Sequence, residues 1–123
     1  MKNLKFRAYN NATDKMTDWE FIRKVKNLNK LMTLNHVDVM QFTGLKDCDG
    51  KEIYEGDLLV DIDVELEEGL KLEDTTEQVY WCEIFGSWNL DNTYSQNMKS
   101  GTNLAQDLRD FKFRVIGNKY QNK

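Results

Sequence analysis

The sequence contains no proline, one histidine and two cysteines among its 123 residues. The absence of proline and of any serine- or glycine-rich linker favours a single domain over residues 1–123. Cys48 and Cys82 do not form a CxxC pair, so reduced thiols are favoured over a disulfide and no zinc site is indicated. His36 lacks a motif that supplies a nucleophile and an orienting carboxylate. These shortages argue against the common catalytic and metal sites built from cysteine and histidine.

Long apolar runs are also missing. No segment approaches the roughly 20 apolar residues that cross a bilayer, and no apolar stretch follows the positive charges of residues 1–7. We therefore expect a cytoplasmic protein without a membrane anchor. The net charge of −4 argues against a general nucleic-acid binder, which needs an excess of lysine and arginine.

The charges are unevenly placed along the chain. Lysine and arginine gather in residues 1–30 and 109–123, whereas aspartate and glutamate concentrate between Asp47 and Glu83. Two arrangements are open: the fold brings the basic ends onto the acidic middle, or it presents two faces of opposite sign to partners.

Short alternating segments indicate a mainly β chain. Residues 19–32 are ambiguous, because their apolar spacing suits a helix capped by Asp18 while their β-forming residues suit a strand; we favour the helix. A short helix is expected from Thr102 or Asn103 through Phe111. The expected strands are residues 4–9, 15–19, 36–42, 51–54, 58–66, 79–85, 88–90 and a last strand from residue 113.

The clearest alternation runs from Leu58 to Leu66. It predicts a strand with one apolar face and one acidic face. The acidic face carries Asp61, Asp63, Glu65 and Glu67.

Motifs for enzymatic chemistry are missing. Residues 47–52 resemble part of a calcium loop, but they lack the third spaced oxygen ligand and the distant glutamate, so a hairpin turn explains them better. The sequence has no glycine-rich phosphate loop. We expect no catalytic residue, no metal and no cofactor.

One long block is more specific. Residues 38–59 read DVMQFTGLKDCDGKEIYEGDLL, the opening reads KFRAY at residues 5–9, and the close reads FRVIGNKY at residues 113–120. In this order and spacing, the three blocks resemble the YopX family of phage and prophage proteins of Gram-positive bacteria. The resemblance implies a mainly β, SH3-like small barrel with one or two short helices, residence in a bacterial host cell, and self-association. It implies no defined activity. Gly44, Gly50 and Gly56 stand where turns need a positive φ or a close backbone approach, so we interpret the block as folding information.

Two features carry the functional expectation. The acidic face of residues 61–67 is either a solvated edge that blocks strand pairing or a contact surface for a host protein. Most of the aromatic residues near Trp81 are expected in the core, with Trp81 itself as an alternative exposed anchor for a partner or a second subunit.

We therefore expect a non-enzymatic phage accessory protein that acts by protein–protein contact. The alternative is a nucleic-acid-binding module that gathers basic residues from both ends of the chain on one face. Those residues are Lys2, Lys5, Arg7, Arg109, Lys112 and Arg114.

Overall fold

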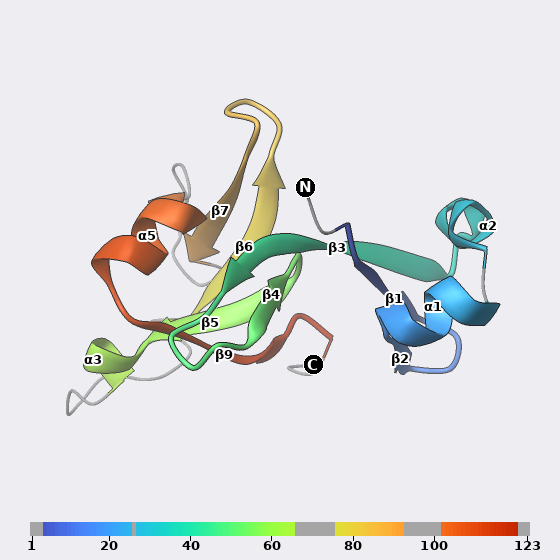
Figure 1. Ribbon diagram of the computed structural model, residues 1–123, viewed down its shortest axis with the longest axis horizontal. Helices are drawn as coiled ribbons and strands as arrows, with labels where there is room; N and C mark the ends of the chain where they lie inside the picture. Colours follow the sequence, from blue (N-terminus) through green and yellow to red (C-terminus); the bar gives the residue numbers. More distant parts are fainter. Residues whose placement is uncertain (1–3, 26, 66–75, 93–101, 121–123) are drawn as a thin grey trace.

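The computed structural model describes residues 4–25, 27–65, 76–92 and 102–120 (Figure 1). Their helices are α1 (Trp19–Val25), α2 (Leu28–Thr33), α3 (Ile62–Glu65) and α5 (Leu104–Asp110). Their strands are β1 (Phe6–Asn10), β2 (Lys15–Thr17), β3 (Val37–Lys46), β4 (Glu52–Tyr54), β5 (Asp57–Asp61), β6 (Glu77–Cys82), β7 (Ser87–Asn92), β8 (Thr102–Asn103) and β9 (Phe113–Asn118).

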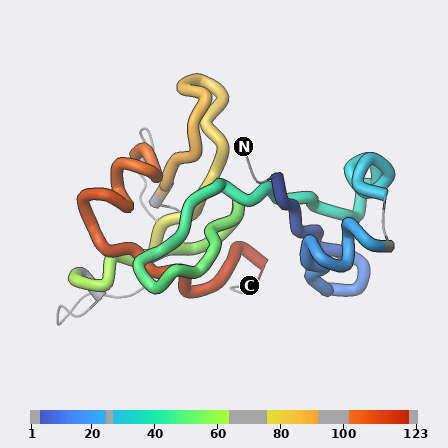
Figure 2. Tube along the Cα trace, in the orientation of Figure 1, coloured from blue at the N-terminus to red at the C-terminus, as the bar shows by residue number. Residues whose placement is uncertain are grey.

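The strands form two antiparallel sheets, with strand orders β2-β1-β3-β4 and β8-β7-β6-β5-β9. The molecule is elongated, and the long strand β3 runs from the end that carries β1, β2, α1 and α2 to the end that carries the five-stranded sheet (Figure 1). Strands at the second end curl into a half-barrel (Figure 2). The mainly β fold is confirmed, with four short helices among the described residues where one or two were expected.

The main apolar core lies at the end of the five-stranded sheet. Leu59 of β5, Val79 of β6 and Leu104 of α5 are fully buried there, because α5 packs its apolar side on the sheet. Of the two expected caps of α5, Thr102 and Asn103, it is Asn103 that accepts a hydrogen bond from the Gln106 N–H, at 3.0 Å.

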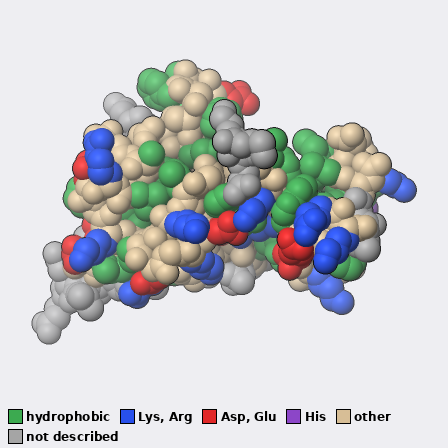
Figure 3. Space-filling model, viewed as in Figure 1, with side chains coloured by type: hydrophobic (Ala, Val, Ile, Leu, Met, Phe, Trp, Pro, Cys, Tyr) green, Lys and Arg blue, Asp and Glu red, His purple; other side chains and the backbone are tan. Residues whose placement is uncertain are grey.

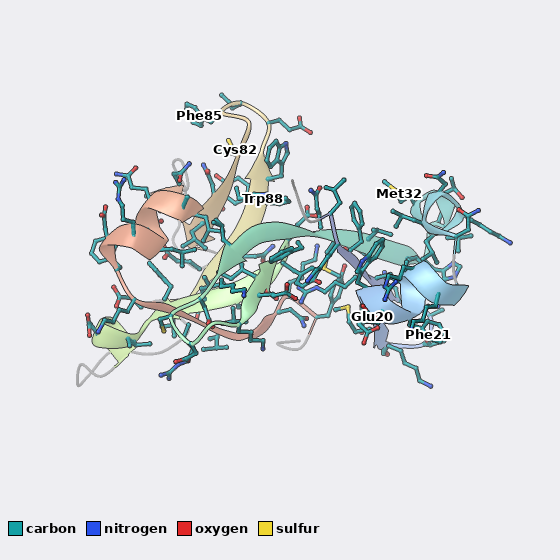
Figure 4. The ribbon with its side chains drawn as sticks, viewed as in Figure 1. Glu20, Phe21, Met32, Cys82, Phe85 and Trp88 are labelled. Carbon is teal, nitrogen blue, oxygen red and sulfur yellow. The ribbon has the colours of Figure 1, made fainter. Side chains whose placement is uncertain are left out.

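Residues 19–32 form two short helices, so the helical interpretation is confirmed but the single helix is wrong. Asp18 caps α1 through the Phe21 N–H at 3.0 Å, and Asn27 starts α2 by accepting from the Lys30 N–H at 3.3 Å. A second capping residue in the middle of the segment therefore divides the apolar spacing between two helices. Phe21 and Met32 remain exposed at this end of the molecule (Figure 4).

Two aspartates of the long block near the middle of the sequence hold its turns. Asp47 is buried and accepts hydrogen bonds from the Asp49, Lys51 and Val115 N–H groups, each at 2.9 Å, so it joins its own loop to β9. Asp57 accepts from the Tyr54 N–H at 2.7 Å across the next turn. These bonds support the interpretation of the block as folding information.

The three glycines of the block all have positive φ, but two of them lie in turns and one lies inside a strand. Gly50 and Gly56 lie in turns with φ of 84° and 86°. Gly44 lies inside β3 with φ of 85°, where the register with β4 shifts between Phe42 and Lys46. The turn expected at Gly44 is therefore a bulge in a longer strand.

The expected strand over residues 58–66 is wrong in its second half. β5 ends at Asp61 and α3 follows, because the Asp61 carboxylate accepts a hydrogen bond from the Asp63 N–H at 3.0 Å and the Ile62 N–H donates to the Lys112 carbonyl at 2.9 Å. β5 is also buried on both faces, since Leu58, Leu59 and Val60 are all buried. The chain thus has no strand with one acidic face at this position.

The expected hairpin of residues 79–90 is confirmed with a longer turn. β6 and β7 pair from Glu77↔Asn92 to Cys82↔Ser87, which leaves residues 83–86 as the turn. Ile84 and Phe85 were expected in the strand, yet they lie at the tip with 88% and 70% of their surfaces exposed (Figure 4). None of the helices among the described residues is long and apolar enough to cross a membrane.

Candidate partner-binding cleft

A cleft of about 650 Å³ lies between β3, β4 and the β6–β7 hairpin. The cleft is lined by the second half of β3 and by side chains of the hairpin. The side chains that matter chemically are aromatic (Phe42, Trp81, Trp88) and charged (Lys5, Lys46, Glu52). The volume falls within the roughly 300–1,000 Å³ of ligand-binding clefts.

The aromatic wall follows from the register of the hairpin. Trp81 and Trp88 are direct cross-strand partners, and their rings meet edge to face at 5.0 Å and 70°. Trp81 keeps 45% of its surface exposed although this contact covers one side of it. On the β3 side of the cleft, the centre of the buried Phe42 ring lies 5.5 Å from the centre of the Tyr54 ring of β4. The cleft therefore offers apolar surface that no described residue fully covers.

Of the charged side chains that line the cleft, Lys5 and Glu52 form an ion pair, and Lys46 has no ion-pair partner among the described residues. Lys5 Nζ lies 2.7 Å from Glu52 Oε2 and 5.3 Å from the centre of the Phe42 ring. The hydrogen bond with Glu52 raises the pKa of Lys5. Lys46 is exposed and forms no ion pair with any residue that the structure describes. Among the described residues, an anionic group on a ligand would therefore displace no ion-pair partner of Lys46.

The predicted acidic contact surface is not assembled as expected. Asp61 ends β5 half-buried, and Asp63 lies exposed on α3. The side chain of Glu65 and the whole of Glu67 lie outside the described residues. The expectation of four carboxylates on one strand face is wrong, because the strand ends at Asp61.

Asp61 instead belongs to a group of carboxylates around Glu77. The pKa of Glu77 is raised to about 7, first by burial and then by the charges of Asp107, Asp61 and Asp91. Within residues 4–25, 27–65, 76–92 and 102–120, no group of histidine, cysteine, aspartate and glutamate side chains has an arrangement that could hold a metal ion.

The basic ends of the chain fold onto its acidic middle, which is the first of the two arrangements that the charge pattern leaves open. The pairs are Lys5–Glu52, Arg7–Asp57 and Arg114–Asp49, with N–O distances of 2.7, 2.8 and 3.0 Å.

These cations are not gathered as a nucleic-acid interface requires. Arg7 is largely buried against Asp57, and Arg109 lies on α5, far along the molecule from β1 (Figure 1). Lysine and arginine side chains alternate with aspartate and glutamate over the face shown in Figure 3. Lys2 lies outside the described residues.

Sequence reasoning identified Trp81 but missed the cleft around it. His36 is exposed next to β3, Cys48 is exposed and Cys82 is buried, with both thiols free. Phe42, Lys46 and Trp88 were not singled out together, because the cleft joins segments about forty residues apart along the chain. The pairing of Trp81 with Trp88 across a turn was the one local signal for it.

The fold and the cleft define a small, mainly β protein with an aromatic-walled surface cleft. A family model described as YopX protein matches residues 5–123. The chain belongs to the YopX family.

A crystal structure of protein EF1440 from Enterococcus faecalis is similar to this chain with a TM-score of 0.65. The two share 18% sequence identity over 99% of this chain and 96% of the other, so the similarity concerns the fold alone. A comparison with curated proteins finds no match.

Proposed function

We propose that this protein is a non-enzymatic phage or prophage accessory protein that acts in the bacterial cytoplasm by binding another protein through the cleft beside the β6–β7 hairpin. The observation that carries the proposal is Trp81, which keeps 45% of its surface exposed at the cleft and contacts Trp88. Exposed tryptophan beside a polar rim is typical of the residues that contribute most to protein interfaces. The exposed apolar tip of the same hairpin, with Ile84 and Phe85, extends the surface.

Affinity capture from a lysate of the bacterial host tests this proposal. We expect the wild type to capture a host protein that Trp81→Ala captures at least about tenfold less. Loss of a central tryptophan commonly costs about 2 kcal/mol or more of binding free energy, and about 1.4 kcal/mol corresponds to a tenfold change in affinity. Phe111→Ala is the matched control, because Phe111 is also an exposed aromatic residue but lies after α5, outside the cleft. Circular dichroism establishes that both variants are folded.

Charge reversal of the acidic segment separates the two candidate surfaces. Asp61→Lys with Asp63→Lys should leave capture unchanged if the cleft is the contact surface. Capture that is lost in this variant but kept by Trp81→Ala would place the contact on the acidic segment and contradict the proposal. Capture of nucleic acid alone, or self-association alone by sedimentation, would also contradict it.

A further inference from the structure

The tip of the β6–β7 hairpin is an apolar turn that projects from the rest of the molecule (Figure 1). Its four residues, 83–86, are held in place because the Gly86 N–H donates to the Cys82 carbonyl at 2.8 Å. Ile84 and Phe85 are the two most exposed large apolar side chains among the described residues, and Phe85 lies at the outer end of the hairpin (Figure 4). Apolar surface that is presented in this way on a fixed turn is typical of a binding element.

The tip and the cleft are complementary in charge as well as in apolar character. Glu83 is exposed in the turn and forms no ion pair with any residue that the structure describes. Lys46 in the cleft has no ion-pair partner within the same described ranges. The cleft thus combines one lysine with the aromatic surface of Phe42, Trp81 and Trp88, and the tip combines one glutamate with two apolar side chains. Matching of this kind favours association of the two surfaces.

The tip of one molecule cannot enter the cleft of the same molecule. Trp81 and Trp88, which line the cleft, form the cross-strand pair next to Cys82↔Ser87, and that second pair closes the turn. The tip is therefore the continuation of the hairpin that lines its own cleft, and it points along the strands away from that surface. Only the tip of a second copy can reach the cleft.

We infer that two copies of this protein exchange their hairpin tips, so that the tip of each copy binds the cleft of the other. Ile84 and Phe85 then lie against the aromatic side chains of the cleft, and Glu83 of one copy pairs with Lys46 of the other. The two contacts are identical by two-fold symmetry, so the pair closes as a dimer. The inference goes beyond the proposed function, because a host protein that binds the cleft has to displace the tip of the second copy.

Sedimentation equilibrium of the purified protein over roughly 1 μM to 1 mM tests the inference, since a small interface binds in this range. We expect the wild type to form dimers. Glu83→Lys and Lys46→Glu should each weaken dimerisation about tenfold, because the dimer contains the charge contact twice. Phe85→Ala should weaken it at least about tenfold, whereas Phe111→Ala should not, because Phe111 is an exposed aromatic residue outside both the tip and the cleft.

A mixture of the Glu83→Lys protein with the Lys46→Glu protein is the decisive sample. Each variant alone places like charges at both contacts, whereas the mixed dimer pairs opposite charges at both: the native residues at one contact and the introduced residues at the other. The mixture should therefore associate about tenfold more tightly than either variant alone. Asp63→Lys and Lys112→Glu are the matched controls, since both residues are exposed and lie outside the tip and the cleft, and each control should dimerise like the wild type.

Three results would overturn the inference: a wild type that stays monomeric up to about 1 mM, dimerisation that neither charge variant weakens, or a mixture that associates no better than its components. If Trp81-dependent capture of a host protein persists in those cases, the tip exchange fails and the proposed function stands. Dimers that follow the expected pattern, without capture of any host protein, would support the tip exchange and contradict the proposed function.

Discussion

Glu77 is a half-buried carboxyl group of β6 whose ionisation opposes folding. Burial raises its pKa to about 7, and the neighbouring charges of Asp107, Asp61 and Asp91 act in the same direction. In the unfolded chain the group titrates near 4.5. The folded state therefore binds the proton of Glu77 more tightly than the unfolded state does. The stabilisation that this proton provides is complete below pH 4.5 and is lost as the pH rises through about 7.

Glu77→Gln should remove this pH dependence. We expect the variant to exceed the wild type in free energy of unfolding by about 1–2 kcal/mol at pH 8, a value reduced from the full conversion because the group is partly exposed to solvent. The difference should shrink toward pH 4.5. Urea unfolding at pH 4.5, 6 and 8 measures it, with Glu83→Gln in the exposed turn as the control for loss of one negative charge. A constant difference across these pH values would refute the assignment.

The turns of the sheet depend on glycine for different reasons. Gly50 has a φ of 84°, and a Cβ atom there would meet nothing within 4 Å, so Gly50→Ala should cost only backbone strain of about 1 kcal/mol. Gly56 has a φ of 86°, and a Cβ atom there would lie 3.2 Å from the sulfur of the buried Met40 and 3.3 Å from Lys119 Cε.

We expect Gly56→Ala to lower the free energy of unfolding by about 2–3 kcal/mol, because the fully buried Met40 can shift only by displacing its own neighbours, although Lys119 can give way. Chemical denaturation of the two alanine variants side by side compares the losses. Equal losses would mean that the close approach to Met40 contributes nothing.

Sequence reasoning succeeded where a local signal decides the structure and failed where distant segments do. Asp18 was expected as one helix cap and Thr102 or Asn103 as the other, and Asp18 and Asn103 accept the expected backbone hydrogen bonds. The alternation after Leu58 predicted a continued strand, but it could not reveal that Asp61 would bond to the Asp63 N–H and begin a helix. Trp81 was recognised from its position in a strand, whereas its cleft depends on Lys46 and on the course of β3.

The two ends of the molecule are joined by more than the continuous strand β3. Arg7 of β1 pairs with Asp57 at the start of β5, with 2.8 Å between Nη2 and Oδ1, and it also donates to the Glu55 carbonyl at 3.1 Å. Near the C-terminal end, Lys119 Nζ lies 2.9 Å from Asp38 Oδ2, and the Tyr120 hydroxyl donates to the same carboxylate. These contacts connect the two sheets.

Arg7→Met should weaken this connection between the two sheets and thereby lower the free energy of unfolding of the whole protein. It leaves the Asp57 carboxylate buried without its cation, which typically costs about 3–5 kcal/mol. Burial already raises the pKa of Asp57 although Arg7 acts in the opposite direction, so without Arg7 the carboxyl group should take up a proton more readily. The loss should therefore be smaller at pH 4 than at pH 7, because a neutral Asp57 needs no cation.

Urea unfolding of Arg7→Met at the two pH values measures both effects. The matched control is Arg23→Met, whose partner Glu20 lies at the same 2.8 Å but on the exposed face of α1 (Figure 4), and this variant should be indistinguishable from the wild type because surface pairs contribute little. A double variant, Arg7→Met with Asp57→Asn, should recover part of the loss by removing the unpaired charge. If both arginine variants lose the same free energy of unfolding, or if the loss for Arg7→Met does not change with pH, then packing and not the buried Arg7–Asp57 pair connects the two sheets.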